Sequence, residues 1–526
     1  MKNIVETVVV SASQMQQIEE QIFAAGMPVS ALMEKAARLC SDRIGSLYPK
    51  SAFASVGILV GPGHNGGDAL VIARELYLAG YRVQIFRPFF KLKSLTAQHS
   101  HYAASLGISF HEEIEPLHEC KLLIDGLFGF GLTRDLPENI IEVINLINNW
   151  SKPIVSIDLP SGIHTDTGKA LGGAIKATNT LCLGLWKQAF FQDTALEYLG
   201  KSERIDFGIL PHHVCSVLSQ PASVRSMNKA IALELLPLPR SLVTHKYQQG
   251  NLLLICGSRR YAGAAILSAL GARASGVGML SVAVPESLKS LLVSHLPEAL
   301  IVACPENKEG AIASLPFSTT ALSKFDTIAC GCGITKDAQS VVKKVLSAEC
   351  PIILDADGLN ILSELDVTEV LTQREFPTVL TPHAGEFERL FPDMEAESDR
   401  LTLAQTAAKQ SSAIILFKGA RTAIANSAGL TWLIPKSTPA LAKGGSGDVL
   451  TGLTGGLVAQ AIQKDINLLD TVASAAWWHA QAGILAASDR TELGVDATTL
   501  AEYIQIAIQR ELNKIVNAKA NRTRMI

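Results

Sequence analysis

Short apolar segments that end in glycine or aspartate, each followed by a helical pattern, recur along this chain. Residues 56–61 (VGILVG) lead into the glycine-rich residues 62–68, and we expect a helix over 69–79 and a strand over 81–86. A strand, a crossover helix and another strand form a parallel sheet, because parallel neighbours need a long connection. Ligands of such sheets bind outside the carboxyl ends of the strands. We therefore expect an α/β fold with functional residues in the strand-end loops.

Two series of these units are separated by a stretch of weak periodicity that ends near residue 240. Because 526 residues exceed what one core holds, more than one domain is expected. We predict a first domain over residues 1–215, a linker over 216–240 and a second domain over 241–515.

Other patterns predict the elements around these strands. Apolar residues on one stripe predict helical structure over residues 11–48. An alternating segment with a turn at 427–429 predicts a hairpin, and two long helices are expected over 449–462 and 468–487.

Composition narrows the classes of function. The formal net charge is −3 and the pI is near 6.5, which gives no basic footprint for nucleic acid or an anionic membrane. Nine scattered cysteines, an odd number, indicate buried thiols in a reducing compartment. We find neither a signal peptide nor an apolar span long enough to cross a bilayer. A cytoplasmic protein that acts on small molecules is expected.

The sharpest motif is residues 444–452, GGSGDVLTG. Glycines allow consecutive backbone amides to converge, and the helix that follows adds the positive end of its dipole, so Gly445, Ser446 and Gly447 form a candidate anion hole. Asp448 is placed to take a proton from a hydroxyl aimed at a phosphate. A glycine-rich helix start made for tight packing is the alternative, and the motif alone does not decide between them.

Polar groups follow three other strands of the second series. They are residues 355–357 (DAD), 381–386 (TPHAGE) and 418–422 (KGART). Each alone could be a helix cap or a turn. Together, and in this order before the glycine-rich turn, they predict a site at the strand ends.

These motifs carry a family resemblance. With His245-Lys246, Gly257-Ser258, Tyr261-x-Gly263-Ala264 and Gly331-x-Gly333, they resemble the ribokinase-like superfamily and, within it, the ADP-dependent NAD(P)H-hydrate dehydratases, over about residues 246–483. The resemblance implies ADP as co-substrate and Asp448 as the catalytic base. It implies contacts to the hydrated nicotinamide nucleotide from Ala264, Gly333, His383 and Asp448. It implies contacts to the adenine nucleotide from Lys418, Gly419, Ala420, Arg421, Thr422 and Gly447.

The same resemblance implies that Glu386 organises Mg²⁺ through water. One departure is visible, because Ala442-Lys443 stands where the family pattern has Ala-Thr. Lys443 either contacts a phosphate or points outward.

The glycine-rich residues 61–68 are neither of two common phosphate-binding loops. No lysine follows the glycines, and Pro62 removes an amide donor from a G-x-G-x-x-G pattern. Together with residues 125–134 (DGLFGFGLTR) and 158–162 (DLPSG), they resemble the NAD(P)H-hydrate epimerases, over about residues 10–215. Turn and capping residues of an ordinary parallel sheet are the alternative.

The resemblance implies substrate contacts and a K⁺ site in this domain. The contacts would come from His64, Asn65, Gly66, Gly67, Asp68, Gly129, Phe130, Gly131, Leu132, Thr133, Arg134, Asp135 and Asp158. The K⁺ ligands would come from Asn65, Asp125 and Ser161, whose oxygens suit an alkali cation. Asp158 is the candidate for the proton transfer that inversion requires.

We therefore expect an N-terminal Rossmann-like three-layer domain followed by a ribokinase-like α/β domain. The expected function is repair of hydrated NADH and NADPH by an epimerase fused to a dehydratase. The alternative is a vitamin-precursor kinase with an N-terminal binding scaffold. A homo-oligomer is also expected.

Overall fold

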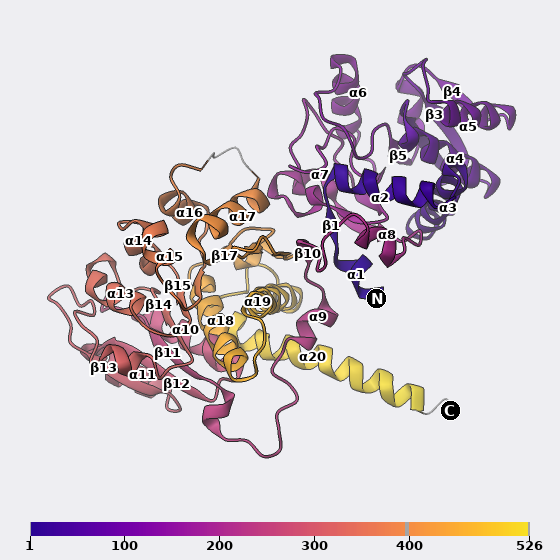
Figure 1. Ribbon diagram of the computed structural model, residues 1–526. Coiled ribbons are helices and arrows are strands. Elements are labelled where there is room, and N and C mark those ends of the chain that lie inside the picture. Colours follow the sequence, from indigo (N-terminus) through magenta and orange to yellow (C-terminus); the bar gives the residue numbers. More distant parts are fainter. Residues whose placement is uncertain (1, 395–398, 524–526) are drawn as a thin grey trace. The chain divides into compact units, whose positions relative to one another are not determined.

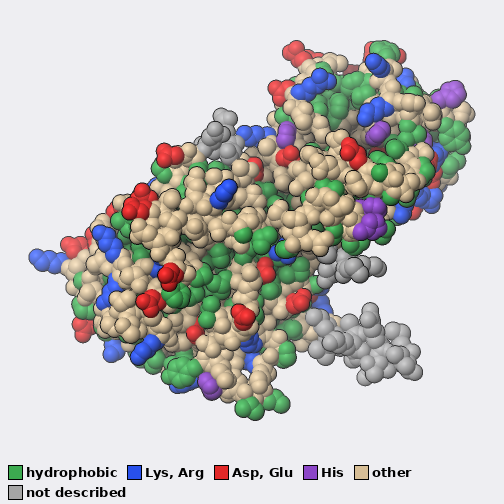
Figure 2. All heavy atoms as spheres, in the orientation of Figure 1, with side chains coloured by type: hydrophobic (Ala, Val, Ile, Leu, Met, Phe, Trp, Pro, Cys, Tyr) green, Lys and Arg blue, Asp and Glu red, His purple; other side chains and the backbone are tan. Residues whose placement is uncertain are grey.

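The computed structural model describes residues 2–394 and 399–523. The chain divides into two compact units, Met1–Arg225 and Ser226–Ile526 (Figure 1). Each unit is built on its own largely parallel sheet, so the predicted α/β fold class is confirmed for both. Among the described residues, no helix combines the length and apolar character needed to span a bilayer. On the face drawn in Figure 2, acidic and basic side chains are interspersed.

The first unit contains a seven-stranded sheet in which every neighbouring pair is parallel. Its order is β4-β3-β2-β5-β6-β7-β9. From β2 the chain winds one way to β4 and then returns to wind the other way from β5, so β2 and β5 flank a topological switch point. The strands are β2 (Ser55–Val60), β3 (Arg82–Phe86), β4 (Ser109–His111), β5 (Leu122–Gly126), β6 (Ile154–Ile157), β7 (Asn179–Leu183) and β9 (Lys201–Ile205).

Helices cover both faces of this sheet, which gives the expected three layers. Val56, Ile58 and Val60 of β2 lie in one apolar cluster with residues of α3 and α4. The intervening Leu59 lies in a second apolar cluster, on the other face of the sheet, with residues of α6. The helices of this unit are α1 (Lys2–Thr7), α2 (Ala12–Ala24), α3 (Val29–Leu47), α4 (His64–Leu78), α5 (Ser94–Ser105), α6 (Glu138–Asn148), α7 (Leu196–Leu199) and α8 (Pro211–Cys215). A separate parallel pair joins β1 (Val9–Val10) to β8 (Trp186–Lys187).

The helical structure predicted over residues 11–48 is confirmed as two helices, α2 and α3, which are separated where Gly26 adopts φ 100° and Pro28 precedes α3. One local prediction in the first unit needs correction. Helix α4 begins at His64, five residues before the predicted start. Its first turn fits closely against the end of β2, where a Cβ on Gly66 would lie 1.9 Å from the carbonyl oxygen of Gly61. The glycines that suggested a loop therefore permit a helix at close approach.

The second unit contains a ten-stranded sheet with the order β10-β19-β18-β17-β16-β15-β14-β11-β12-β13. Strands from β17 to β13 are parallel, and the predicted hairpin is confirmed as the antiparallel β18–β19 pair. Here the winding direction changes between β11 and β14. The strands are β10 (Val224–Ser226), β11 (Asn251–Ile255), β12 (Met279–Pro285), β13 (Leu300–Cys304), β14 (Thr327–Cys330), β15 (Ile352–Leu354), β16 (Thr378–Leu380), β17 (Ile414–Phe417), β18 (Ala423–Ala425) and β19 (Thr431–Leu433).

Helix α18 (Ser446–Gln463) is buried along most of its length and packs tightly on α10 (Ala262–Ser275). Glycines allow the two backbones to meet: a Cβ on Gly452 would lie 1.8 Å from the carbonyl oxygen of Ser268, and one on Gly271 would lie 2.1 Å from that of Val449. The sequence analysis gave tight helix packing as the alternative role of the glycine-rich segment. Such packing occurs in α18 at Gly452, beyond the turn at residues 444–447.

Two more features of the second unit extend the sequence-based picture. Helix α19 (Leu468–Arg490) is followed by a third long helix, α20 (Ala497–Thr523), which the sequence analysis did not predict. The segment 216–240, predicted as a linker, contains α9 (Lys229–Glu234), and the carbonyl of Ala232 accepts a hydrogen bond from Nε1 of Trp478 in α19. The remaining helices are α11 (Lys289–His295), α12 (Thr319–Leu322), α13 (Gln339–Leu346), α14 (Asp357–Leu362), α15 (Val367–Thr372), α16 (Ala384–Leu390) and α17 (Arg400–Ser411).

Candidate active sites

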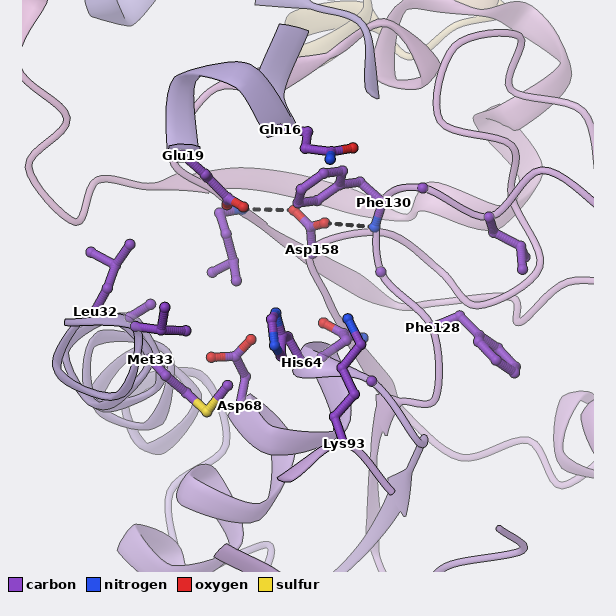
Figure 3. Close-up of a pocket in the computed structure, with 18 of the residues that line it drawn as sticks. Gln16, Glu19, Leu32, Met33, His64, Asp68, Lys93, Phe128, Phe130 and Asp158 are labelled. Atoms are coloured by element: carbon purple, nitrogen blue, oxygen red, sulfur yellow. Dashed lines mark hydrogen bonds between the residues drawn. The ribbon is translucent and has the colours of Figure 1, made fainter. Parts of the chain in front are cut away.

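A cavity of about 560 Å³ lies in the first unit at the switch point between β2 and β5 (Figure 3). This is the position expected for a ligand site in an open parallel sheet. Most of the predicted substrate contacts line it, together with side chains of α2 and α3. The predicted residues in the lining are His64, Asn65, Asp68, Gly129, Phe130, Gly131, Leu132 and Asp158.

Five predicted contacts lie outside this lining. Gly66 and Gly67 are buried in the first turn of α4, where Gly67 packs against the side chain of Met33. Thr133, Arg134 and Asp135 are exposed beyond the rim. The structure therefore brings together the strand-end part of the predicted set and leaves Thr133, Arg134 and Asp135 in solvent.

An ion pair stands in the wall of the cavity. Nζ of Lys187, whose side chain is fully buried, lies 2.5 Å from Oδ1 of Asp158 and also donates to the carbonyl oxygen of Leu183. Oδ2 of Asp158 accepts from the amide of Phe130 at 3.0 Å. Burial lowers the pKa of Lys187, but the charges of Asp158 and Glu19 and the thiol of Cys182 outweigh burial and raise it overall. Asp158 is thus an oriented anion paired with a buried cation.

Two further carboxyl groups line the same cavity. Burial raises the pKa of Glu19, on α2, to about 7, against the pull of Lys187. Asp68, in α4, is buried and forms no hydrogen bond with the described residues, and its pKa is raised well above the usual value by burial and by the charges of Asp158 and Glu19. Glu19 can therefore carry a proton near neutral pH, and Asp68 releases its proton less readily than an ordinary aspartate.

The predicted K⁺ ligands lie beside the cavity. Asp125 is fully buried, and its carboxylate accepts from the hydroxyl of Ser161 at 2.5 Å, the amide of Ser161 at 2.8 Å and the hydroxyl of Ser156 at 2.8 Å. No described cationic side chain pairs with this carboxylate. The side-chain nitrogen Nδ2 of Asn65 is buried and has no hydrogen-bond partner in the described chain. A buried anion among oxygen donors fits an alkali cation.

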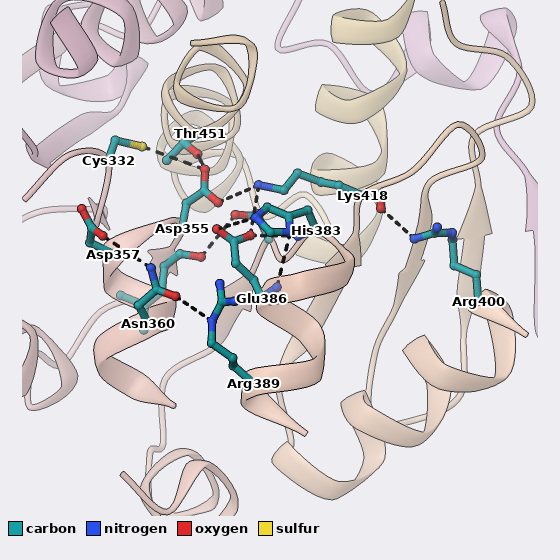
Figure 4. Close-up of polar contacts among 12 residues, drawn as sticks. Cys332, Asp355, Asp357, Asn360, His383, Glu386, Arg389, Arg400, Lys418 and Thr451 are labelled. Atoms are coloured by element: carbon teal, nitrogen blue, oxygen red, sulfur yellow. Dashed lines mark hydrogen bonds and ion pairs between the residues drawn. The ribbon is translucent and has the colours of Figure 1, made fainter. Parts of the chain in front are cut away.

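In the second unit, three strand ends meet around one lysine (Figure 4). Nζ of Lys418, after β17, lies 2.8 Å from Oδ1 of Asp355, after β15, and 3.7 Å from Oε2 of Glu386 in α16. Oδ2 of Asp355 accepts from the hydroxyl of Thr451 in α18 at 2.6 Å. Although burial raises the pKa of Asp355, Lys418 and the hydrogen bonds lower it overall. The predicted strand-end cluster is therefore assembled.

Asp448 lies in the first turn of α18, next to this cluster. Burial raises its pKa to about 6, the charge of Asp355 acts in the same direction, and Cys332 and Lys418 oppose the shift. Cys332, one of the nine cysteines, is buried and lies beside Asp448 at the site. A carboxylate that titrates close to neutral pH suits a general base.

The turn before Asp448 presents free amides. Gly445 caps α18 with φ 91°, a conformation that glycine adopts readily, and no described residue accepts a hydrogen bond from the amides of Gly447 or Asp448, whereas the amide of Ser446 donates to the carbonyl oxygen of Lys443 at 3.3 Å. Nε2 of the buried His479 lies 2.9 Å from the carbonyl oxygen of Ser446. Burial lowers the pKa of His479 to about 4, so the ring is neutral and holds the turn without a charge. The amide of Gly447 is thus available to an anion, and the anion hole remains a prediction.

The other predicted contacts of this site fall into two groups. Ala264 and Gly333 meet at the switch point, since a Cβ on Gly333 would lie 2.9 Å from the Cβ of Ala264. His383 caps α16 and interacts with Glu386, with a half-exposed ring.

The 418–422 segment starts at this cluster and runs outward. The backbone oxygen of Lys418 accepts from Arg400 at 2.7 Å, and Gly419 packs against the same guanidinium. Ala420, Arg421 and Thr422 follow at the entrance to β18, where Thr422 donates to the carbonyl of Gly419.

The sequence left the role of Lys443 undecided, and in this structure its side chain binds backbone carbonyl oxygens. Its Nζ donates to the carbonyl oxygens of Leu493 at 2.8 Å and Val495 at 2.6 Å. The side chain therefore ties the glycine-rich turn to the loop between α19 and α20.

Comparison with known proteins adds independent findings. A family model described as NAD(P)H-hydrate dehydratase matches residues 252–506, and one described as YjeF-related protein N-terminus matches residues 29–189. A relative from Synechocystis sp., named bifunctional NAD(P)H-hydrate repair enzyme Nnr, is 54% identical over 98% of this chain and 97% of its own. The chain belongs to the bifunctional NAD(P)H-hydrate repair enzyme family.

Other members of this repair family are also similar over nearly the whole chain. The relative from Thermosynechococcus vestitus is 49% identical over 96% of this chain and 98% of its own. Among solved structures, the ADP/ATP-dependent NAD(P)H-hydrate dehydratase from Bacillus subtilis, co-crystallized with ATP/Mg²⁺, is 32% identical, covers 54% of this chain and 98% of that chain, and has a TM-score of 0.47. The resemblance drawn from the motifs is confirmed, and the relatives named as repair enzymes cover both units.

Sequence reasoning missed four residues that contribute to the two sites of this repair-family member. They are Glu19, Lys187, Arg400 and His479. Glu19 lies one helical turn after Met15, on a largely buried face of α2, and Lys187 ends an apolar segment. A charged residue among apolar ones is unusual, and this pattern could have identified both as site residues from the sequence. Arg400 and His479 lie outside every quoted motif, and only the packing of α17 and α19 brings them to the site.

Proposed function

We propose that this protein repairs hydrated NADH and NADPH in two steps. The first unit interconverts the R and S hydrates, and the second uses ADP to dehydrate the S hydrate to NAD(P)H with release of AMP and phosphate. Near-full-length similarity to the named repair enzymes supports the pairing of activities. The observation that carries the dehydratase step is Asp448 in the first turn of α18, beside free amides and the Lys418–Asp355 pair.

The dehydratase chemistry follows from this placement. Asp448 takes the proton of the substrate hydroxyl, whose oxygen then bonds to the terminal phosphorus of ADP while the bond to AMP breaks. The amides of Gly445, Ser446 and Gly447 stabilise the charge that shifts onto the phosphoryl oxygens. Phosphate then leaves as the ring nitrogen donates its electron pair, and loss of a proton from the neighbouring carbon restores the dihydronicotinamide.

We propose the following contacts for the two nucleotides. Ala264, Gly333, His383 and Asp448 contact the hydrate. The 418–422 segment, with Gly447, holds the adenine nucleotide, and the charge of Lys418 faces its phosphates. Mg²⁺ neutralises phosphate charge when it is bound. Oε2 of Glu386 already accepts from the amide of His383 at 2.8 Å, which suits contact with that ion through water rather than directly.

We propose that the first unit binds the hydrate in its 560 Å³ cavity, with the strand-end residues described above as its contacts. K⁺ is held by oxygens of Asn65, Asp125 and Ser161, and its charge compensates the buried carboxylate. The functional limits 1–215 and 241–515, the linker 216–240, homo-oligomerisation and a cytoplasmic location remain predictions.

The test is recovery of dihydronicotinamide absorbance from S hydrate supplied with ADP or with ATP. Wild-type protein is expected to recover it with ADP and to release AMP and free phosphate. Asp448→Asn should lose at least ~100-fold in rate, because it removes the base and keeps the shape. The exposed Asp337→Asn is the matched control and should leave the rate unchanged. A phosphorylated alcohol that accumulates instead of free phosphate would indicate a kinase, and full activity of Asp448→Asn would remove Asp448 from the mechanism.

A further inference from the structure

One route to inversion at the ring carbon beside nitrogen is loss and re-addition of water, and this route uses groups on both faces of the ring. The hydroxyl leaves from one face as water, which needs a proton donor, and water adds to the other face, which needs a proton acceptor. A single carboxyl group held on one side of the ring serves only one of these steps. By this route the first unit uses two groups of intermediate proton affinity that approach the substrate from different directions.

Asp158, the sequence-based candidate for proton transfer, is poorly placed for this task. Its Oδ1 is occupied by Nζ of Lys187 at 2.5 Å and by the amide of Leu183 at 3.3 Å, and its Oδ2 by the amide of Phe130 at 3.0 Å. Donors thus engage both oxygens of Asp158, and these contacts suit an anion that orients the cavity wall. Proton transfer calls for a carboxyl group with an available oxygen.

Glu19 and Asp68 meet this requirement. Both line the cavity, Glu19 from α2 and Asp68 from the start of α4, and Figure 3 shows their side chains pointing into it from opposite sides. Among the described residues, no side-chain hydrogen bond contributes to the pKa of either carboxyl group, which is shifted by burial and by neighbouring charges.

Their positions follow from the fold. The parallel pair β1–β8 places the chain that enters α2 next to the strand that carries Lys187. The glycines of α4 bring its first turn against β2. Two elements far apart in the sequence therefore supply the two carboxyl groups.

We infer that Glu19 and Asp68 are the acid and base of the epimerase, one on each side of the bound nicotinamide ring. This inference rests on the proposed function of the first unit. The Asp158–Lys187 ion pair is a positioning element, and its buried cation limits the negative charge that the two carboxyl groups experience. The charge of Glu19 adds to burial and to the charge of Asp158 in raising the pKa of Asp68, so Asp68 holds its proton more firmly when Glu19 is ionised.

The step balances as follows. The protonated carboxyl group transfers its proton to the leaving hydroxyl, the C–O bond breaks with its electron pair on oxygen, water departs, and the nitrogen lone pair forms a C=N bond. A second water adds to the opposite face, the C=N electron pair returns to nitrogen, and the other carboxylate takes the released proton. The reverse reaction uses the same two groups with their roles exchanged.

Electrostatics agree with this geometry. Burial raises the pKa of Glu19 to about 7, and burial with the charges of Asp158 and Glu19 raises the pKa of Asp68 well above its usual value. The charged and titratable groups around the pair are Lys187 on β8, Asp158 after β6, Glu20 on α2, His64 on α4, Lys93 before α5 and Cys40 on α3. The rate of epimerisation is therefore expected to show a bell-shaped dependence on pH for both the R-to-S and the S-to-R reaction.

The experiment follows conversion of purified R hydrate to S hydrate by chromatography, with K⁺ and without adenine nucleotide, so that the dehydratase is inactive. Glu19→Gln and Asp68→Asn are each expected to lower the rate at least ~100-fold. Glu19→Asp should recover part of the loss with an altered pH profile. In H₂¹⁸O, the label should enter the product at the rate of inversion, because the C–O bond breaks.

Controls separate this inference from the proposed function. Glu142→Gln changes an exposed glutamate of the same unit and should have no effect. Each variant should still dehydrate S hydrate with ADP at the wild-type rate, and thermal unfolding shows whether the first unit remains folded. Because Glu19 is only partly buried, its variant carries the test if Asp68→Asn fails to fold.

A wild-type rate no faster than spontaneous conversion would overturn the proposed epimerase itself. Wild-type conversion that Glu19→Gln retains in full, or inversion without entry of ¹⁸O, would overturn the acid–base pair alone. If Asp158→Asn loses the R-to-S conversion while Glu19→Gln keeps the wild-type rate, Asp158 rather than Glu19 transfers the proton.

Discussion

The ammonium group of Lys418 lies 2.8 Å from the carboxylate of Asp355, and this ion pair joins two strand ends that are 63 residues apart in the chain. Asp355 is almost completely buried, whereas Lys418 keeps about a fifth of its side chain exposed. The pair therefore contributes to the stability of the second unit and, at the same time, presents a cation at the proposed nucleotide site.

Replacement of Lys418 should affect stability and nucleotide binding together. Lys418→Met leaves a buried carboxylate without its cation, so we expect a loss of about 2 kcal/mol in the free energy of unfolding, less than for a fully buried pair because Lys418 is partly exposed. Urea denaturation followed by tryptophan fluorescence measures this loss, and the KM for ADP should rise in parallel. Lys308→Met, at an exposed position, is the control. Equal midpoints for the two variants would contradict the prediction.

The dehydratase should lose activity on the acid side of neutrality. A general base works only when ionised, and burial raises the pKa of Asp448 to about 6. The value of kcat/KM should therefore fall as pH decreases through about 6 and reach a plateau above it. Initial rates with S hydrate and ADP between pH 5 and about 8 test this. A profile that is flat down to pH 5 would argue against Asp448 as the base.

The close approach of α10 and α18 should tolerate no side chain at Gly452. Since a Cβ there would lie 1.8 Å from the carbonyl oxygen of Ser268, Gly452→Ala must push the helices apart, with an expected cost of about 2 kcal/mol. The displaced α18 carries Asp448, so dehydratase activity should fall while R-to-S conversion is unchanged. Gly263→Ala, on the same α10 but with open space around it, should keep the unfolding midpoint of the wild type.

Exchange of K⁺ for choline at constant ionic strength should lower epimerisation and leave dehydration unchanged. The physical reason is the buried carboxylate of Asp125, which no described cationic side chain neutralises. Ser161→Ala removes one proposed oxygen ligand and should raise the K⁺ concentration for half-maximal rate by at least about tenfold. If epimerisation proceeds at full rate in choline, the cation does not act there.

Much of the architecture could be predicted from local patterns. Apolar strands followed by glycine or aspartate predicted two parallel sheets, and the alternation around residues 427–429 predicted the β18–β19 hairpin. The first turn of α4 was misassigned as a loop, because Gly66 and Gly67 have low helix propensity and their advantage is the close packing they allow. Helix α20 was missed for a related reason, since its stability depends on α19 and α10.

For both sites, some of the functional residues could be identified from the sequence and others only from the tertiary structure. The sequence by itself determined the motif residues, such as Asp448 and Asp125, and the family to which they point, because these depend on residue type and spacing alone. Only the tertiary structure decided that Lys443 binds carbonyl oxygens, that Lys187 pairs with Asp158, and that Glu19 faces the cavity. Such contacts join elements far apart in the chain, and burial, which sets the pKa of each group, arises only when those elements pack.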